Sequence, residues 1–229
     1  VYITQLVAFY KLESISFFIK DLIFYIENIV KKGQLKLINI YDYQMLVPLG
    51  VSGIGRALHV FKGREYDHKW ILEKILKDGD VIFDLGANIG YYPMLENAIL
   101  KGKCSIFSVE PDPRNITVLQ ANISEFNLKN IQFEQLAISN FTGDAELVFS
   151  DKTNLNKLSI IGDNANSKEV TVTVPVVDFA EYIRKIGHID VLRMDIEGAE
   201  VDIFDSLVNN YAKDPSLKIP RRIIFETHC

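Results

Sequence analysis

The chain has 229 residues, of which 48% are hydrophobic, so it can bury a sizeable core in one domain or at most two. Its formal net charge is −5 and its pI is about 5.4, which argues against a general nucleic-acid-binding protein, because such proteins usually carry a basic surface. The two cysteines, Cys104 and Cys229, have the spacing of neither a disulfide framework nor a zinc site. We therefore expect a reducing, cytoplasmic location.

The chain begins at Val1 rather than at Met and ends directly after an apolar run, so we expect it to be a piece of a longer protein. The most apolar stretch, residues 15–30, is interrupted by Lys20, Asp21 and Glu27. It falls short of the ~20 continuous apolar residues that span a bilayer, so no transmembrane segment is expected.

Residues 1 to about 38 predict a helix, because apolar side chains cover much of its circumference. The simplest role for this helix is packing on the rest of the domain, and the alternatives are contact with a second copy in a homodimer or with a membrane surface. Residues 43–50 and 56–63 predict two strands of a hairpin around the glycine-containing turn VSGIG. Residues 1–64 are thus expected to form an N-terminal extension of helix and hairpin.

Residues 65–229 are expected to form the main domain, which begins with a helix over residues 65–80 and then alternates short strands with helices. This alternation is typical of parallel βαβ units. The predicted fold class is α/β, a doubly wound, mostly parallel Rossmann-like sheet with helices on both faces. Two further strands are expected on either side of the polar segment 151–168, which we interpret as a lid or an acceptor-binding loop. The strands of the parallel sheet are predicted at 81–86, 104–112, 131–139, 189–198 and 221–228.

The segment VIFDLGANIGYYPML, residues 81–95, places two glycines in the first strand-to-helix turn. Ligands of doubly wound sheets bind at the carboxyl ends of the strands, and Gly86 and Gly90 would let the backbone approach such a ligand closely. The dinucleotide motif G-x-G-x-x-G fails, because Asn88 and Tyr91 stand where it requires glycine. Asp84 would repel a pyrophosphate and suits a cation. The turn therefore favours a nucleoside with a positive group and no phosphate, and S-adenosylmethionine fits.

Glu110 ends the second predicted strand, 20 residues after Gly90. A carboxylate at that point can accept hydrogen bonds from both hydroxyls of a ribose. The structural alternative is that Gly86 and Gly90 only permit tight packing, that Asp84 caps a helix and that Glu110 is a solvated loop acid.

These segments, followed by FSVEPDPRN, EQLAISNFTGDAEL, VVDFAEYI, VLRMDIEGAEVDIF and IIFETH, resemble FkbM-type S-adenosylmethionine-dependent methyltransferases from about Glu65 to the C-terminus. The resemblance implies a class I methyltransferase fold and O-methylation, commonly of sugar hydroxyls in glycans or natural products. It places Ala137 near the adenine, and Asp195 and Glu65 near the methionine end of the cofactor. The other cofactor-binding residues it implies are Asp84, Gly86, Asn88, Gly90 and Glu110. The antiparallel strand pair that normally closes such a sheet is missing before Cys229, and the first 40 residues match no motif.

A sugar hydroxyl must lose its proton during methyl transfer, so a base is expected near the methyl group. The candidates at the ends of the last two parallel strands are Asp195, Glu197, Glu226 and His228. We favour His228 as the base, because imidazole ordinarily titrates near neutral pH, with Asp195 or Glu197 orienting the acceptor or the ring. The same groups could bind a divalent cation, but their spacing is not diagnostic and no metal is predicted.

The partner expected from the sequence is a small-molecule or glycan acceptor, with no nucleic acid. Methylation of a lipid, a protein or a nucleic acid is an alternative, as is a non-catalytic cofactor-binding or scaffolding domain. The acidic pI and the lack of an Asn-Pro-Pro-Tyr-like motif after the fourth parallel strand count against methylation of a nucleic-acid base.

Overall fold

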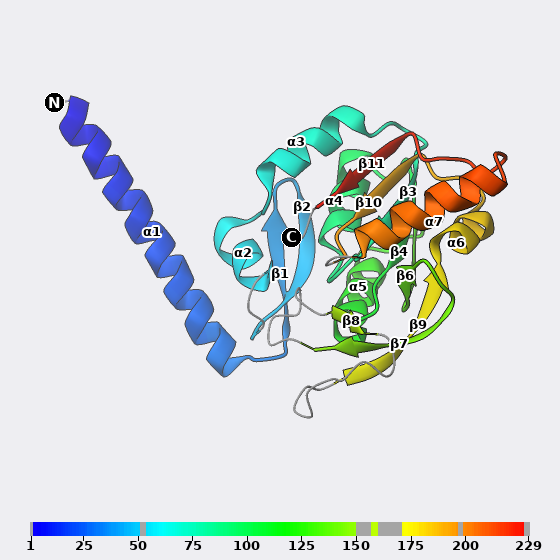
Figure 1. Ribbon diagram of the computed structural model, residues 1–229. Helices are drawn as coiled ribbons and strands as arrows, with labels where there is room; N and C mark the ends of the chain where they lie inside the picture. The colour runs from blue at the N-terminus through cyan, green and yellow to red at the C-terminus, as the bar shows by residue number, and fades with distance from the viewer. Residues whose placement is uncertain (1, 51–53, 150–156, 160–170, 197–198, 227–229) are drawn as a thin grey trace. The chain divides into compact units, whose positions relative to one another are not determined.

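The computed structural model describes residues 2–50, 54–149, 157–159, 171–196 and 199–226. The chain divides into two compact units, Val1–Glu65 and Tyr66–Cys229 (Figure 1). This boundary lies one residue from the one expected from the sequence. Among the described residues, no helix has the length and apolar content needed to span a membrane.

The N-terminal unit is built from a long helix, a hairpin and a short helix. Helix α1 spans Tyr2–Val30 without an internal glycine or proline, and it ends just before Gly33, whose φ of +83° is left-handed. Strands β1 (Leu35–Ile40) and β2 (Tyr43–Pro48) pair antiparallel across a two-residue turn, and helix α2 spans Ile54–Phe61.

Two expectations for this unit are wrong in detail. The N-terminal helix stops at Val30 rather than near residue 38, and the segment that follows it is the first strand of the hairpin. Ile38 and Ile40 alternate with exposed neighbours along that strand, which is the pattern of a half-buried β-strand. The predicted strand at 56–63 is largely helix α2, because eight residues are too few for periodicity to distinguish the two states.

Helix α1 packs on the rest of its unit through one buried aromatic residue. Phe24 forms a cluster with Leu49 and Val60, and its ring lies 5.1 Å from the ring of His59. His59 is 7% exposed and bonds to the backbone of Val47. The imidazole is thus enclosed between α1 and the hairpin, and burial lowers its pKa from 6.5 to about 4.

The C-terminal unit contains the predicted parallel sheet, which confirms the fold class. Five parallel strands have the order β11-β10-β3-β4-β5, the doubly wound order in which the first strand lies at the centre. The strands are β3 (Val81–Leu85), β4 (Ser105–Val109), β5 (Ile131–Glu134), β10 (Val191–Met194) and β11 (Arg222–Phe225).

Helices cover both faces of this sheet (Figure 1). Phe83, Leu192 and Met194 pack on one face against α6 and α7, and Phe179 of α6 and Ile203 of α7 belong to the same buried cluster. On the opposite face Arg193 lies against Tyr92 of α4. The helices are α3 (Tyr66–Ile75), α4 (Tyr91–Ile99), α5 (Pro113–Glu125), α6 (Phe179–Ile186) and α7 (Glu200–Lys213).

A second sheet with the order β6-β9-β7-β8 lies in the chain between β5 and α6. The single strand predicted at 131–139 is therefore wrong: its two halves, β5 and β6, belong to different sheets. Within the segment 151–168, which we interpret as a lid, the structure describes β8 alone. The rest of the predicted lid lies outside the described residues. The strands are β6 (Ala137–Ser139), β7 (Gly143–Val148), β8 (Lys157–Ser159) and β9 (Thr171–Asp178).

The burial of His59 predicts that acid destabilises the N-terminal unit. In the unfolded chain this imidazole takes up a proton near pH 6.5, whereas in the folded unit it does so only near pH 4. Protons therefore favour unfolding, and stability falls as the pH drops through this window, by at most about 3 kcal/mol. Urea unfolding at several pH values should show the loss, and His59→Phe should flatten the curve. An equally steep curve in the variant would assign the acid sensitivity to other groups.

Candidate functional site

The turn between β3 and α4 uses all of its backbone N–H groups within the protein. Each of the five N–H groups from Gly86 to Gly90 donates a hydrogen bond of 2.8–3.1 Å inside the chain. The turn therefore has no free N–H between Gly86 and Gly90 with which to hold a phosphate. The acceptors are the Val109 carbonyl for Gly86 and Ala87, the Glu110 carboxylate for Asn88, the Asn88 side chain for Ile89 and the Ala87 carbonyl for Gly90.

Both glycines of the turn also have a packing role, as the structural alternative required. Gly86 has a φ of +79°, and a Cβ there would collide with the backbone carbonyl of Asp195. Gly90 has a φ of +94°, and a Cβ would lie 2.7 Å from the side chain of Leu119 on α5. The glycines thus bring the turn against the end of β10 and against α5, and the turn is held by both elements.

Glu110 lies immediately after β4 and is 6% exposed. Its Oε2 accepts from the Asn88 N–H at 2.8 Å, and its Oε1 accepts from the Asp112 N–H at 3.0 Å and from Asn115 Nδ2 at 3.2 Å. A carboxylate offers about four acceptor positions, so these bonds leave Oε2 one position for a ligand hydroxyl. Burial raises the pKa of Glu110 to about 7 against the opposing effect of these donors.

The cation beside Asp84 is the guanidinium of Arg193. Asp84 is fully buried, and its Oδ1 accepts from Arg193 Nη1 at 2.9 Å. Arg193 Nη2 donates to Asp195 Oδ2 at 3.1 Å, and the guanidinium lies 3.4 Å from the ring centre of Tyr92. We expected the cation near Asp84 to come from a ligand, but this oxygen is occupied within the protein. Asp84 Oδ2 is buried without a hydrogen-bond partner among the described residues.

Glu96 is a second buried carboxyl group on the same side of the sheet, on α4. It is fully buried, and neither of its oxygens has a hydrogen-bond partner within the described ranges. Burial and the nearby Asp84 raise the pKa of Glu96 well above its ordinary value, which favours the neutral form of this carboxyl group. Among the described carboxylates, Asp84 and Asp195 are the ones that accept hydrogen bonds from Arg193.

A small cavity of about 150 Å³ lies at the carboxyl ends of β10 and β11. Its polar lining comes from His68 on α3, Tyr92 on α4, Arg193 on β10 and Glu226 directly after β11. His68 Nδ1 and the Tyr92 hydroxyl share a hydrogen bond of 2.7 Å. Apolar side chains of α3 and of the two strands complete the wall.

Four residues around this site were not predicted from the sequence: His68, Tyr92, Arg193 and Glu96. Arg193 offered a signal, because it is a cation in an otherwise apolar strand, two residues before Asp195. His68 offered none, because it lies outside every recognised motif and meets Tyr92 only in the folded chain.

The remaining predicted residues are scattered or lie outside the described ranges. Ala137 is buried at the start of β6, in the second sheet. Glu65 ends the N-terminal unit and forms an ion pair with Arg64. Glu197 and His228 are not among the described residues. Within the described part of the chain, no group of three or more His, Cys, Asp and Glu residues is placed to hold a metal ion.

Comparison with known proteins identifies a family. The family model of the methyltransferase FkbM domain matches residues 84–228. "Methyltransferase 1" of Beauveria bassiana is 27% identical over 152 residues, which are 57% of this chain and 59% of that protein. The "Ribosomal RNA large subunit methyltransferase E" of Bdellovibrio bacteriovorus is 28% identical over 138 residues, 58% of this chain and 66% of that protein. The chain thus spans about six tenths of these two relatives.

Among solved structures, the methyltransferase FkbM of Methylobacillus flagellatus matches with a TM-score of 0.44 and 17% sequence identity. The match covers 72% of this chain and 43% of that one.

The contact of Gly86 with β10 predicts a strong effect of Gly86→Ala. In this variant the alanine must adopt a left-handed φ, and its Cβ collides with the Asp195 carbonyl. We therefore expect a loss of about 3 kcal/mol or more in the free energy of unfolding. Gly79→Ala is the matched control, because Gly79 has a φ of +89° with nothing near its missing Cβ, and it should lose only about 1–2 kcal/mol. Denaturant unfolding measures both, and equal losses would show that the contact with β10 costs nothing.

Proposed function

Because this chain belongs to the methyltransferase FkbM family, we propose that it transfers the methyl group of S-adenosylmethionine to a hydroxyl group of a sugar, in a glycan or a natural product. The observation that carries this proposal is that the turn has no free N–H group for a phosphate, while the buried carboxylate of Glu110 can still accept a hydrogen bond from a ligand. The N–H groups of residues 86–90 are all used internally, while Glu110 keeps one acceptor position for a hydroxyl. A nucleoside without phosphates matches both features.

In this proposal the ribose binds at Glu110 and the nucleoside lies over the turn formed by Gly86, Asn88 and Gly90. Asp195, directly after β10, faces the methionine end of the cofactor. Arg193 bonds to both Asp84 and Asp195 and so links the two carboxylates. Ala137, three residues beyond β5, is assigned to the adenine side. Glu65 keeps its assignment to the methionine end as a prediction.

When bound, S-adenosylmethionine would supply a methyl group activated by its positively charged sulfur, and the bond from this carbon to sulfur would break to release the neutral thioether S-adenosylhomocysteine. The chain's own residues then have to align the acceptor hydroxyl with that carbon and take up its proton as the new O–C bond forms. The cavity at the ends of β10 and β11 supports such a role, because it gathers a histidine, a tyrosine and a carboxylate beside Asp195's partner Arg193.

His68 joins Glu226, which is already a candidate from the sequence, as a possible base in this cavity. A ring nitrogen of His68 can accept a proton, while Tyr92 fixes the ring through Nδ1. Glu226 lines the same cavity from the carboxyl end of β11. The other candidates from the sequence, His228, Glu197 and Asp195, stay predictions, with Asp195 held by Arg193.

Calorimetric titration tests the cofactor. S-adenosylmethionine and S-adenosylhomocysteine should bind, and NADH should not. Because only the ionised Glu110 offers its full set of acceptor positions and its pKa is about 7, affinity should rise about tenfold from pH 6 to pH 8. In Glu110→Gln the affinity should fall at least about tenfold, which is the loss of one charge-assisted bond. The contribution of Glu110 to the pH dependence should disappear as well.

Thermal unfolding of Glu110→Gln shows whether the variant is folded. Absence of binding to either adenosyl ligand by the folded wild-type protein would contradict the proposed function. A Glu110→Gln protein that binds as tightly as wild type would contradict the role of Glu110 alone.

The base is tested with His68→Phe and Glu226→Gln. Radiolabelled methyl transfer to a panel of mono- and oligosaccharides should fall by about 10²–10⁴-fold for the variant that lacks the base, while S-adenosylmethionine affinity stays unchanged. Asp67→Asn, an exposed neighbour of His68 on α3, is the control and should behave as wild type. Unchanged transfer in both variants would return the role to Asp195, Glu197 or His228.

A further inference from the structure

Helix α1 turns many of its apolar side chains between residues 15 and 30 away from its own unit, although Phe17 and Phe24 contact it. Eight isoleucine, leucine, valine and phenylalanine residues between positions 15 and 30 are 46–72% exposed. At 3.6 residues per turn they cover an arc of about 140°. We call these residues the outer face of α1: Ile15, Phe18, Ile19, Leu22, Ile23, Ile26, Ile29 and Val30.

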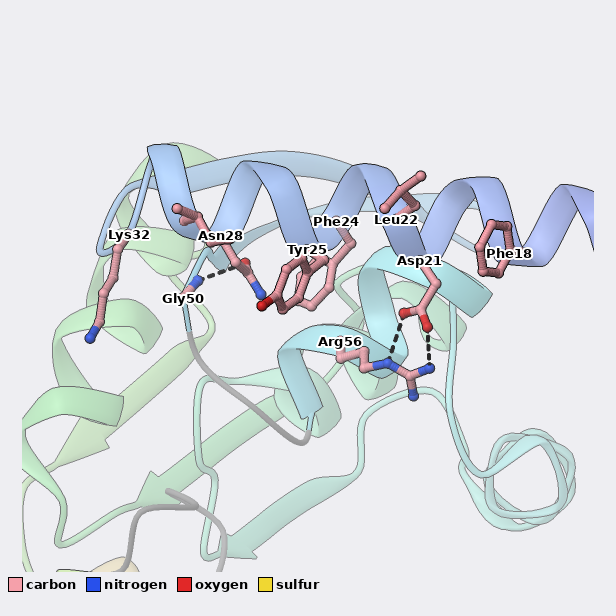
Figure 2. Close-up of a pocket in the computed structure, with 10 residues that line it drawn as sticks. Phe18, Asp21, Leu22, Phe24, Tyr25, Asn28, Lys32, Gly50 and Arg56 are labelled. Carbon is pink, nitrogen blue, oxygen red and sulfur yellow. Dashed lines mark hydrogen bonds and ion pairs between the residues drawn. The ribbon is translucent and has the colours of Figure 1, made fainter.

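The polar side chains of the same helix segment point toward the unit instead. Asp21 accepts two hydrogen bonds of 2.8 Å from Arg56 of α2, and Asn28 Oδ1 accepts from the Gly50 N–H at 2.7 Å. Figure 2 shows Asp21 and Asn28 directed toward these partners and Leu22 directed away from them. Together with buried Phe24, these bonds fix the rotation of the helix about its axis, so the outer face cannot turn inward.

The outer face is broader than the seam of a two-helix contact. Such a seam uses two positions of every seven, a and d, and Ile15, Phe18, Leu22 and Ile29 would supply them. Ile19, Ile23, Ile26 and Val30 would remain outside it and exposed. A flat apolar environment would cover all eight residues at once.

The charge of the N-terminal unit favours an anionic environment. Residues 1–65 contain eight lysines and arginines but five acids, a net charge of +3 in a chain whose total is −5. Lys31 and Lys32 follow the outer face directly, are exposed and have no ion-pair partner among the described residues. Burial and the repulsion of Lys36 and Lys20 lower the pKa of Lys62, so further lysines lie close together. Two such units would repel each other.

A groove of about 750 Å³ runs beside the outer face (Figure 2). Phe18, Leu22, Tyr25 and Ile29 line it, and Lys32 lines it near the C-terminal end of α1. An apolar groove with a lysine beside its end suits an acyl chain that carries an anionic headgroup.

We propose that the outer face of α1 docks on an anionic lipid surface, with the apolar residues among the acyl chains and the lysines at the headgroups. This proposal does not rest on the methyl-transfer proposal.

Vesicle co-sedimentation of the full chain tests it. Vesicles of phosphatidylcholine with about one third phosphatidylglycerol should bind the protein at least about tenfold more tightly than phosphatidylcholine alone. Higher salt should weaken this binding, because it screens the lysines. Absence of binding by the folded protein, or equal binding to both vesicles, would overturn the proposal.

Variants locate the binding surface. Leu22→Glu combined with Ile26→Glu should reduce vesicle binding at least about tenfold, because two charges would enter the acyl region. The matched control is Val201→Glu combined with Val208→Glu, two residues of α7 that are 68% and 63% exposed, and it should bind as wild type. Lys31→Glu combined with Lys32→Glu should remove the preference for anionic vesicles. Circular dichroism verifies the fold of each variant.

Light scattering distinguishes binding of a lipid surface by the outer face from binding of a second copy of the chain by the same face. A dimer that Leu22→Glu with Ile26→Glu disrupts, in a protein that binds no vesicles, would overturn the lipid proposal and assign the outer face to the predicted homodimer. A monomer that binds anionic vesicles through this face supports the lipid surface.

Discussion

The buried guanidinium of Arg193 fixes the positions of two strand ends and one helix in the C-terminal unit. A guanidinium that is 5% exposed on an inner strand of a parallel sheet costs several kcal/mol unless it is paired. The register of β10 on β3 places Asp84 directly beside it, and Asp195 follows two residues later on the same strand. Tyr92 of α4 covers the remaining face of the cation. Through this one residue the end of β3, the end of β10 and the first turn of α4 are held in a single geometry.

The parallel sheet could be predicted because its strands are short apolar runs bounded by glycine turns and separated by helices. The N-terminal unit could be predicted only in part. Leu58 and Val60 alternate as in a strand but lie on helix α2, while Ile38 and Ile40 alternate within β1 after a long apolar helix. Both segments are short, so local periodicity could not separate helix from strand, and packing around Phe24 and Leu49 decides between them.

The candidate site shows the same division between local and long-range information. The turn with Gly86 and the acid Glu110 could be identified from spacing, because strand ends of a parallel sheet meet at one edge. The in-chain partner of Asp84 required the register of two strands that are more than 100 residues apart in the sequence. The contact between His68 and Tyr92 required the placement of α3 beside α4, which no motif encodes.

The second sheet begins and ends at one place. Ala137, the first residue of β6, pairs with Val176 near the end of β9, so the chain returns to its starting point before α6 begins. Among the described residues, the segment between these two strands also contacts the helices, because Phe149 lies against the guanidinium of Arg114 on α5 and Asn140 donates to Asp202 on α7. Changes in this segment that keep the pairing of β6 with β9 and the contact of Phe149 with Arg114 should leave Glu110 and Arg193 in place. In engineering terms the unit separates a frame of parallel strands from an appendage, and the appendage can be altered while the frame is kept.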